Sequence, residues 1–384
     1  MFFGGLMMNK FLITLATLVA FTLSGVAYAQ SVSGQMQRII GVGDGVDGGI
    51  AEQFTRVVIS ADTTADNGWV VGGSMSIQTA AATGGANAPS TNHMYIQTDA
   101  LTVNIGNTIG PAIVLVPGVS AMVPGGGIDA GYQFLFDGGN LATWGVSGRE
   151  AYYASNAAKI DIDLPSINGF TVGMSYTPSE EFKATTQARQ ESENTANHTD
   201  TVEVAVQYAG ELDDLSYTLG VGWLTGNSQS TTVGSATSNI AQTNNNDLSA
   251  FTAAIQVTMG NMTIGLSGFD NGESFGASGD TDVASNNGYN TAITWAMGNI
   301  TFGVGYSHQE LVRGTRAQAN ATKLTAAAAG NVREDNFTYV GIGYDMGGGV
   351  STYVQLSNND HSDGDHVTNE ADPQVLFAGI NIGF

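Results

Sequence analysis

The sequence predicts an all-β fold: a 16-stranded antiparallel transmembrane β-barrel with an inward-folded third extracellular loop. Three observations favour this class. Segments of about ten residues, the length that crosses a bilayer as a tilted strand, alternate apolar with small or polar side chains. The connections between them alternate between short and long, and the apolar parity carries almost no charge. Counting the segments gives about sixteen, and bacterial single-chain barrels have an even number of strands.

Residues 1–29 have the pattern of a secretory signal peptide. Lys10 precedes an apolar run at 11–26, and Ala27, Tyr28 and Ala29 have the small-x-small form of a signal peptidase site. We expect cleavage after Ala29 and export through the Sec pathway, with residues 30–384 forming the barrel. An uncleaved anchor is the alternative, but the run is short for a spanning helix.

Composition narrows the classes of function. The chain has no Cys, which excludes disulfides and thiol chemistry. It has 34 Asp plus Glu against 11 Lys plus Arg, whereas nucleic-acid binding needs a basic surface, so we expect no nucleic-acid partner. There is no Gly-x-Ser-x-Gly elbow at a strand-to-helix junction and no convergent nucleophile and base. We therefore expect no enzymatic activity and no catalytic residues.

The alternation assigns two environments to each strand. Trp69, Val71 and Met75 share one parity, and the other parity of the same stretch is mostly small or polar. In residues 215–223 and 300–306 the second parity is Gly, Ser and Thr alone. Because successive side chains of a strand point to opposite faces, we expect the apolar parity to face lipid and the small polar parity to face the barrel interior.

The connection lengths alternate along almost the whole chain, as short periplasmic turns and long extracellular loops do in an outer-membrane barrel. The short turns are expected at 66–68, 99–100, 165–169, 209–214, 259–261, 297–299 and 345–349. The long connections are expected at 43–50, 80–91, 107–156, 177–200, 225–247, 270–287, 309–335 and 357–373.

The interval 107–156 is the longest without a convincing regular element. It crosses an apolar segment at 113–116 and several prolines and glycines before it reaches its charged residues. Structureless loops beyond ~15 residues are uncommon unless they are functional. A loop folded into the lumen narrows a pore that is otherwise too wide to discriminate, so we predict that residues 107–156 form a constriction loop.

The last strand carries a more specific signal. Leu376, Ala378, Ile380, Ile382 and the terminal Phe384 share one parity. A strand that ends on an aromatic residue after alternating apolar residues resembles the assembly signal of Gram-negative outer-membrane proteins. We therefore expect Phe384, Ile382 and Ile380 to engage the outer-membrane assembly machinery.

The whole mature length resembles a general porin of the Gram-negative outer membrane, of the alphaproteobacterial trimeric type. The order and spacing of seven short motifs carry the resemblance: 33–34, 56–59, 65–69, 101–106, 167–176, 344–349 and Phe384. It implies a homotrimer in outer-membrane lipid, with one water-filled pore per protomer for passive diffusion of ions and small hydrophilic solutes. It also implies that the third loop presents carboxylates across from basic residues of the wall.

The pore constriction residues expected on this basis are Asp129, Asp137, Glu150 and Arg149 in the loop and Arg56 and Lys159 on the wall. Arg149 either lines the pore or pairs with Glu150. Asp161, Asp163 and Glu203 share the inner parity, so the wall is mixed rather than basic. This departs from the family pattern, and we predict only a mild cation preference.

Arg38 breaks the alternation of the first strand, because it lies on the parity of Met36, Ile40 and Val42. It faces lipid, lies in a subunit contact, or marks a bulge that reverses the alternation. The free-energy cost of a lipid-facing Arg favours the subunit contact and the bulge together.

Two other functions stay open. The chain could be a structural or adhesive surface barrel with a closed pore, although such a barrel has less reason to possess the long third interval. It could also be a substrate-specific channel, although neither an aromatic track nor a dense basic cluster is evident. We predict no cofactor and no metal site. Acidic clusters near 44–47, 280–282 and 360–366 could hold Ca²⁺, but solvated loops are the favoured interpretation.

Overall fold

The computed structural model describes residues 29–43, 46–80, 88–127, 157–179, 198–228, 247–272, 274, 285–312, 332–363 and 374–384. The described residues form sixteen strands and one short helix, α2 (Pro111–Leu115). The strands are β1 (Ala29–Gly43), β2 (Val46–Thr64), β3 (Val70–Ala80), β4 (Ala88–Gln97), β5 (Thr102–Thr108), β6 (Ala157–Asp163), β7 (Phe170–Ser179), β8 (His198–Leu212), β9 (Leu215–Ser228), β10 (Leu248–Met259), β11 (Met262–Asp270), β12 (Asn286–Met297), β13 (Ile300–Val312), β14 (Val332–Gly347), β15 (Val350–Asp363) and β16 (Gln374–Gly383).

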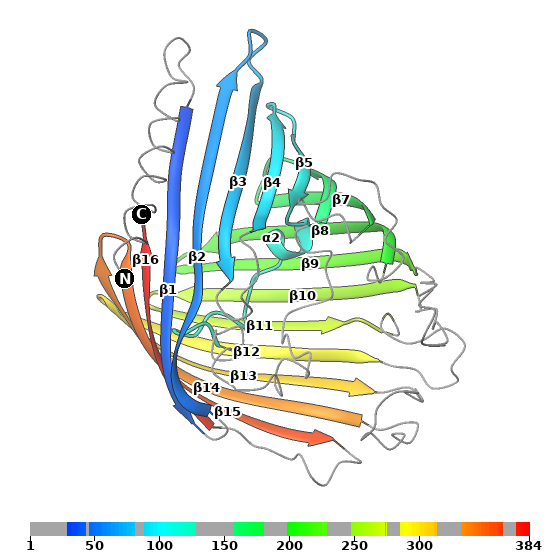
Figure 1. The fold of residues 1–384 in the computed structure, drawn as a ribbon. Coiled ribbons are helices and arrows are strands. Elements are labelled where there is room, and N and C mark those ends of the chain that lie inside the picture. Colours follow the sequence, from blue (N-terminus) through cyan, green and yellow to red (C-terminus); the bar gives the residue numbers. More distant parts are fainter. Residues whose placement is uncertain are drawn as a thin grey trace, which may run out of the picture.

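The strands form one closed antiparallel barrel (Figure 1). Each strand pairs with the next one along the chain, and β1 pairs with β16. Closure matters because an open sheet would expose unpaired N–H and C=O groups at its edges. The predicted fold class is therefore confirmed.

The seam between β1 and β16 is closed by backbone hydrogen bonds and by the packing of one aromatic ring. The Gly34 N–H donates to the Phe384 carbonyl over 2.9 Å, and the Phe384 N–H donates to the Gly34 carbonyl over 3.0 Å. A Cβ at position 34 would collide with the Phe384 ring, so the terminal aromatic residue packs over a glycine. Ile380, Ile382 and Phe384 are all exposed on the outer face, as the alternation predicts.

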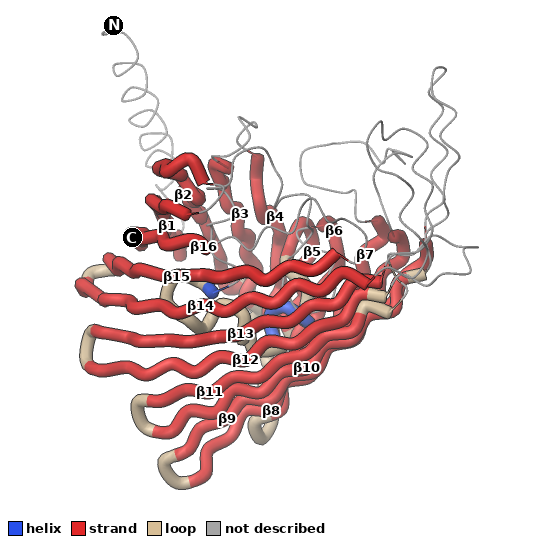
Figure 2. The backbone as a smooth tube through the Cα atoms, turned by 90° about the horizontal axis from the view of Figure 1, so that it is seen from below, coloured by secondary structure: helices blue, strands red, loops and turns tan. Residues whose placement is uncertain are grey.

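Short turns join the strands at one end of the barrel (Figure 2). β10 and β11 are separated by residues 260–261 and β12 and β13 by residues 298–299, close to the predicted positions. One predicted long connection, at 43–50, is wrong: β1 ends at Gly43 and β2 begins at Val46. The glycines and the acidic residue of 46–50 suggested a loop, but their backbone pairs with β1, with Gly41 opposite Gly49.

The two faces of the wall follow the predicted alternation. On the outer face of β7–β14, exposed aromatic side chains form two rows, one near each end of the strands. The row near the short turns contains Phe170, Trp295, Phe302 and Tyr344, and the opposite row contains Tyr176, Trp223, Phe251 and Tyr289. Such rows mark the two membrane–water interfaces of a transmembrane barrel.

Arg38 remains on the outer face of β1, between the exposed Met36 and Ile40. The β1–β2 register shifts between Gln37 and Arg38, which places a bulge at this point. The bulge does not reverse the alternation, because Ile39 is buried on the inner face. The Arg38 guanidinium donates through Nη1 to the Gln37 carbonyl over 3.0 Å.

The interval after β5 contains the short helix α2, whereas the sequence predicted no regular element there. Pro111 begins the helix, and a proline at the first helical position is compatible with the missing N–H donor. No helix among the described residues has the length and hydropathy needed to cross a membrane.

Candidate channel lining and inward segment

Residues 109–127, here called the inward segment, run along the inside of the barrel. Helix α2 contacts β7, β8 and β9, and appears inside the barrel in Figure 1. Beyond α2, the segment passes β10 at Gly118 and β11 at Met122, and it reaches β15 at Gly127. The first part of the predicted constriction loop therefore lies against the inner wall.

The strands that carry the inward segment have glycine at the contact points. A Cβ at Gly220 would lie 2.5 Å from the Leu115 carbonyl oxygen and 2.7 Å from Val116 Cα. Inner-facing glycines on other strands meet the segment in the same way. They are Gly173 against Pro111, Gly222 against Ala112, Gly265 against Val119, Gly303 against Val123 and Gly341 against Pro124. Together with Gly220, these glycines are here called the glycine belt.

Three glutamine side chains of the wall hold the carbonyl groups of the segment. Gln207 on β8 donates through Nε2 to the Leu115 carbonyl over 2.8 Å, and Gln256 on β10 donates to the Gly118 carbonyl over 3.4 Å. Gln355 on β15 both accepts from the Gly127 N–H at 3.0 Å and donates to its carbonyl at 2.9 Å. Backbone polar groups that strand pairing cannot satisfy thus find partners on the wall.

Glu203 on β8 anchors the other end of the segment. Its Oε1 accepts the Ala112 N–H over 2.6 Å, which satisfies one of the free donors at the start of α2. A Cβ at Gly110 would collide with this carboxylate, so the close approach requires glycine. Glu203 is 1% exposed and interacts electrostatically with Lys159, which is itself 3% exposed. This buried pair therefore lies next to the start of the inward segment.

The inward segment and the wall beneath it form an apolar core inside the barrel. Val116, Val119 and Val123 pack with inner-facing residues of β10, β12 and β14, among them Phe337 and Tyr339. A second cluster joins Ala112 and Leu115 to inner-facing residues of β8–β11. Within the described residues, the inner face along the path of the segment is therefore covered.

Strands β2–β6 present a different inner face, here called the open wall. Ser76, Lys159 and Asp161 on this face are buried, but most of the other side chains are polar and half-buried, and they carry no packed segment among the described residues. They include Arg56, Ser60, Asp62, Ser74, His93, Tyr95, Asn104 and Asp163. Hydrogen bonds link them along the wall, such as Ser60 to Ser74 at 3.0 Å and Tyr95 to Asp62 at 3.3 Å.

The charges of the open wall and of its border with β8 are mostly negative. Asn104 donates to Asp161 over 3.0 Å and to Asp163 over 3.3 Å, which holds the two carboxylates of β6 on one face. Lys159 also interacts with Asp161. Arg56 faces a cavity of about 340 Å³ that Gln35 and Asn381 also line.

The predicted site residues are placed as follows. Arg56 and Lys159 lie on the inner face, but only Arg56 reaches open space, because Lys159 is buried beside Glu203. Asp129, Asp137, Arg149 and Glu150 lie outside the described residues. Gln207, Gln256 and Gln355 were not predicted from the sequence, and neither was the contact of Glu203 with the loop. The inner-parity glycines of 215–223 and 300–306 were the available signal for the glycine belt.

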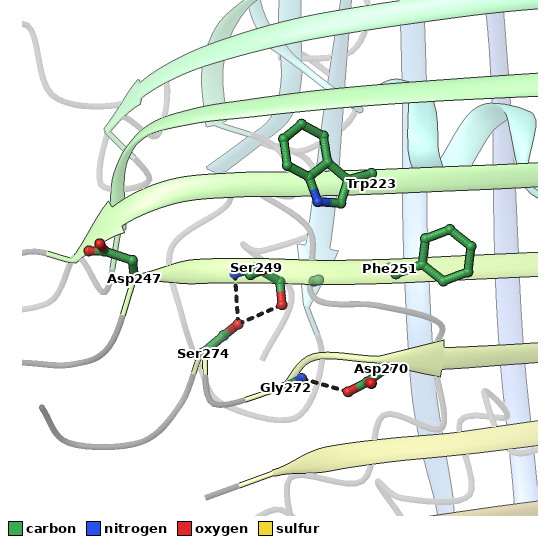
Figure 3. A pocket seen from close by; sticks show the side chains of 8 residues that line it. Trp223, Asp247, Ser249, Phe251, Asp270, Gly272 and Ser274 are labelled. Carbon is green, nitrogen blue, oxygen red and sulfur yellow. Dashed lines mark hydrogen bonds between the residues drawn. The ribbon is translucent and has the colours of Figure 1, made fainter. Parts of the chain in front are cut away.

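A separate cavity of about 530 Å³ lies at the strand ends opposite the short turns (Figure 3). Trp223, Phe251 and Asp270 line it, together with Ser274. The Ser274 hydroxyl accepts from the Ser249 N–H at 2.9 Å and donates to the Ser249 carbonyl at 3.0 Å, as the dashed lines show. Trp223, Phe251 and Asp270 lie on the outer parity of their strands, so this cavity does not belong to the open wall.

No group of three or more His, Cys, Asp or Glu residues in the described part of the chain is arranged to hold a metal ion. The acidic clusters near 44–47, 280–282 and 360–366 lie largely outside that part.

A closed barrel with aromatic rows outside, a polar strip inside and a chain segment fixed in the lumen defines an outer-membrane channel protein. The family model described as Gram-negative porin matches residues 14–364, and the chain belongs to this family. Family and fold point to a channel rather than an enzyme.

Solved structures of outer-membrane proteins share the fold. A loop-deletion mutant of OmpT from Vibrio cholerae has a TM-score of 0.62 at 14% sequence identity. The match covers 94% of this chain and 100% of the OmpT chain. An anion-selective porin from Comamonas acidovorans has a TM-score of 0.62 at 12% identity, covering 93% and 100%. A mutant porin of Rh. blastica has a TM-score of 0.56 at 16% identity, also covering 93% and 100%. No curated protein sequence matches the chain significantly.

Proposed function

We propose that the chain forms a water-filled channel for the passive diffusion of ions and small hydrophilic solutes, with a mild preference for cations. The observation that carries the proposal is the open wall, a strip of half-buried polar side chains on β2–β6, which lies beside an inward segment fixed to β7–β15. A barrel of sixteen strands is wide enough to keep an aqueous channel after one side has been filled.

The preference for cations follows from the charges of the inner wall. Asp62, Asp161, Asp163 and Glu203 outnumber Arg56 and Lys159 there. A low-dielectric pore wall with net negative charge raises the local concentration of cations. The Comamonas porin is anion-selective, but at 12% identity the likeness concerns the fold alone. The preference for cations therefore rests on this chain's own residues.

The constriction extends into the rest of the predicted loop. Asp129, Asp137 and Glu150 add carboxylates to the lumen, and Arg149 either lines the pore or pairs with Glu150. On this account Asp129→Asn and Asp137→Asn lower the cation preference, as changes on the open wall do.

The test is a planar-bilayer recording of the refolded protein under a salt gradient. The expected result is a large, stable conductance with a reversal potential whose sign shows that cations are more permeant than anions. Stable insertion without conductance contradicts the proposal, and supports instead a closed barrel whose work is structural or adhesive. Saturable conductance for one solute alone supports a substrate-specific channel.

We also propose that the chain assembles as a homotrimer through the outer face of β1–β6. Within strands β1–β6, none of the described outward side chains is aromatic; Trp69 is exposed at the turn before β3, so only the aromatic row at the long-loop end is interrupted on this face. Arg38 lies on the same face of β1, where a subunit contact would shield it from lipid. One similar structure of OmpT is described as a trimer form. Native mass spectrometry is expected to give three copies, and a monomer at every detergent concentration contradicts the assembly.

Export and insertion complete the proposal. Residues 1–29 direct the chain through the Sec pathway, and the strand that ends at Phe384 engages the assembly machinery. Deletion of Phe384 is expected to lower the amount of folded barrel in the outer membrane, without preventing refolding in detergent.

A further inference from the structure

The inward segment is apolar on the side that faces the lumen. Ser120 is the one side chain of residues 109–127 with a hydrogen-bonding group, and it is buried against the wall. Val114 is 59% exposed, and Gly118 and Ala121 are exposed between it and the end of the segment. We call these three residues the apolar ledge.

The direction of the ledge follows from the closed shape of the barrel. Pro111, Ala112 and Leu115 form the buried side of α2 and pack on β7–β9. Val114 lies on the other side of the helix. In a closed tube, a segment packed on one part of the inner wall presents its free side to the lumen and to the opposite part of the wall. The ledge therefore faces the lumen that the open wall borders.

The ledge is also held in place. Glu203 binds the start of α2, Gln207 binds its last carbonyl, and Gln355 binds Gly127 at the far end of the segment. The glycine belt leaves no room between the segment and the wall. The lumen thus has a fixed apolar surface along the inward segment, whereas the open wall offers half-buried carboxylates at Asp62 and, next to the start of the segment, at Asp163.

We propose that this channel favours small amphipathic ammonium compounds, which have an apolar group for the ledge and a charged group for the open wall. The inference rests on the proposed channel function and specifies its solute class. An ammonium group gains from the carboxylates of the wall. An alkyl group that contacts the ledge removes apolar surface from water, which lowers the barrier to passage.

The experiment compares two ammonium ions of equal heavy-atom count, n-butylammonium and 3-hydroxypropylammonium. Their permeabilities relative to potassium are measured from bi-ionic reversal potentials in planar bilayers. Contact of roughly one methylene group with the ledge predicts that butylammonium is about fourfold more permeant than its hydroxylated counterpart. A purely aqueous pore gives a ratio of about one, since the two ions diffuse alike in water.

Three variants test whether the ledge causes the difference in permeability between the two ions. Val114→Thr keeps the shape of the side chain and replaces one methyl group with a hydroxyl group, and Ala121→Ser adds a hydroxyl group at a second position. Both are expected to bring the ratio towards one. Val114→Ile keeps the surface apolar and is expected to preserve the ratio, which controls for any change at this position.

Two failures are distinguishable. A channel that conducts potassium and prefers cations, but has a ratio near one or a ratio that neither hydroxyl variant lowers, overturns this inference alone. A refolded barrel that conducts no ions contradicts the proposed channel, and the inference with it.

Discussion

Strands β2–β6 and strands β7–β15 belong to one barrel, yet their inner faces meet different neighbours. On β2–β6 many inner side chains are polar and half-buried, as at Ser74 and Asp62. On β7–β15 glycines such as Gly220 and Gly341 lie under the inward segment. Small inner residues are therefore of two kinds. Some keep a lumen open to water, and others make room for another part of the chain.

The largest expected effect comes from adding one methyl group to each of the two faces. Gly220→Ala places a Cβ against the backbone of Leu115 and Val116, and we expect a loss of roughly 2–3 kcal/mol in the free energy of unfolding. Ser74→Thr adds the same group to the open wall, and we expect less than about 0.5 kcal/mol. Urea titrations in detergent, followed by tryptophan fluorescence, measure both. Equal losses would show that the segment does not constrain the wall.

Removal of the anchor at Glu203 is expected to have the next largest effect. Glu203→Ala leaves the Ala112 N–H without its acceptor and removes one of the two carboxylates that interact with the buried Lys159, so we expect a loss of about 2 kcal/mol and a noisier open-channel current. Glu203→Gln keeps an oxygen acceptor and should cost less. Identical current noise in the wild type and Glu203→Ala would contradict the anchoring role.

A smaller loss is expected at the other end of the segment. Gln355→Ala removes both hydrogen bonds to Gly127 and should cost about 1–2 kcal/mol of unfolding free energy. The matched change on a half-buried inner position of β1, Gln35→Ala, should cost less than about 0.5 kcal/mol. A reversed order of the two losses would weaken the contrast between the faces.

Changes on the open wall itself are expected to have the smallest effect on stability. They are expected to change ion selectivity instead. Asp62→Asn and Asp163→Asn keep the shape and remove one lumen charge each, so each should lower the cation-to-anion permeability ratio by less than about twofold. The change should grow as the salt concentration falls, because screening weakens. Reversal potentials at two ionic strengths measure it. An unchanged ratio at low salt would assign selectivity to other residues.

Alternation along the sequence predicted which parity faces inward, because a strand places successive side chains on opposite faces regardless of distant contacts. It thus located Arg56, Lys159 and Asp161 on the inner face correctly. It could not show that Lys159 is buried, because burial there depends on the pairing of Glu203 with Ala112, 91 residues earlier in the chain.

The path of the inward segment was beyond sequence reasoning for the same reason. Gln355 and Gly127 are 228 residues apart, and nothing local to either one predicts their contact. The apolar composition of 109–127 and the inner-parity glycines were both visible. Each feature is common in barrels. Only the structure shows that the apolar segment packs on these inner-face glycines.

The most direct test of the account uses the absence of cysteine from the chain. Ser74→Cys on the open wall and Ser267→Cys, buried on the inner face of β11, are matched single-cysteine variants. A charged thiol reagent added during planar-bilayer recording reports which of the two positions lines the conducting path. We expect rapid modification and a stepwise fall in current for Ser74→Cys, and no change for Ser267→Cys. Modification of Ser267→Cys at an equal rate would contradict the account.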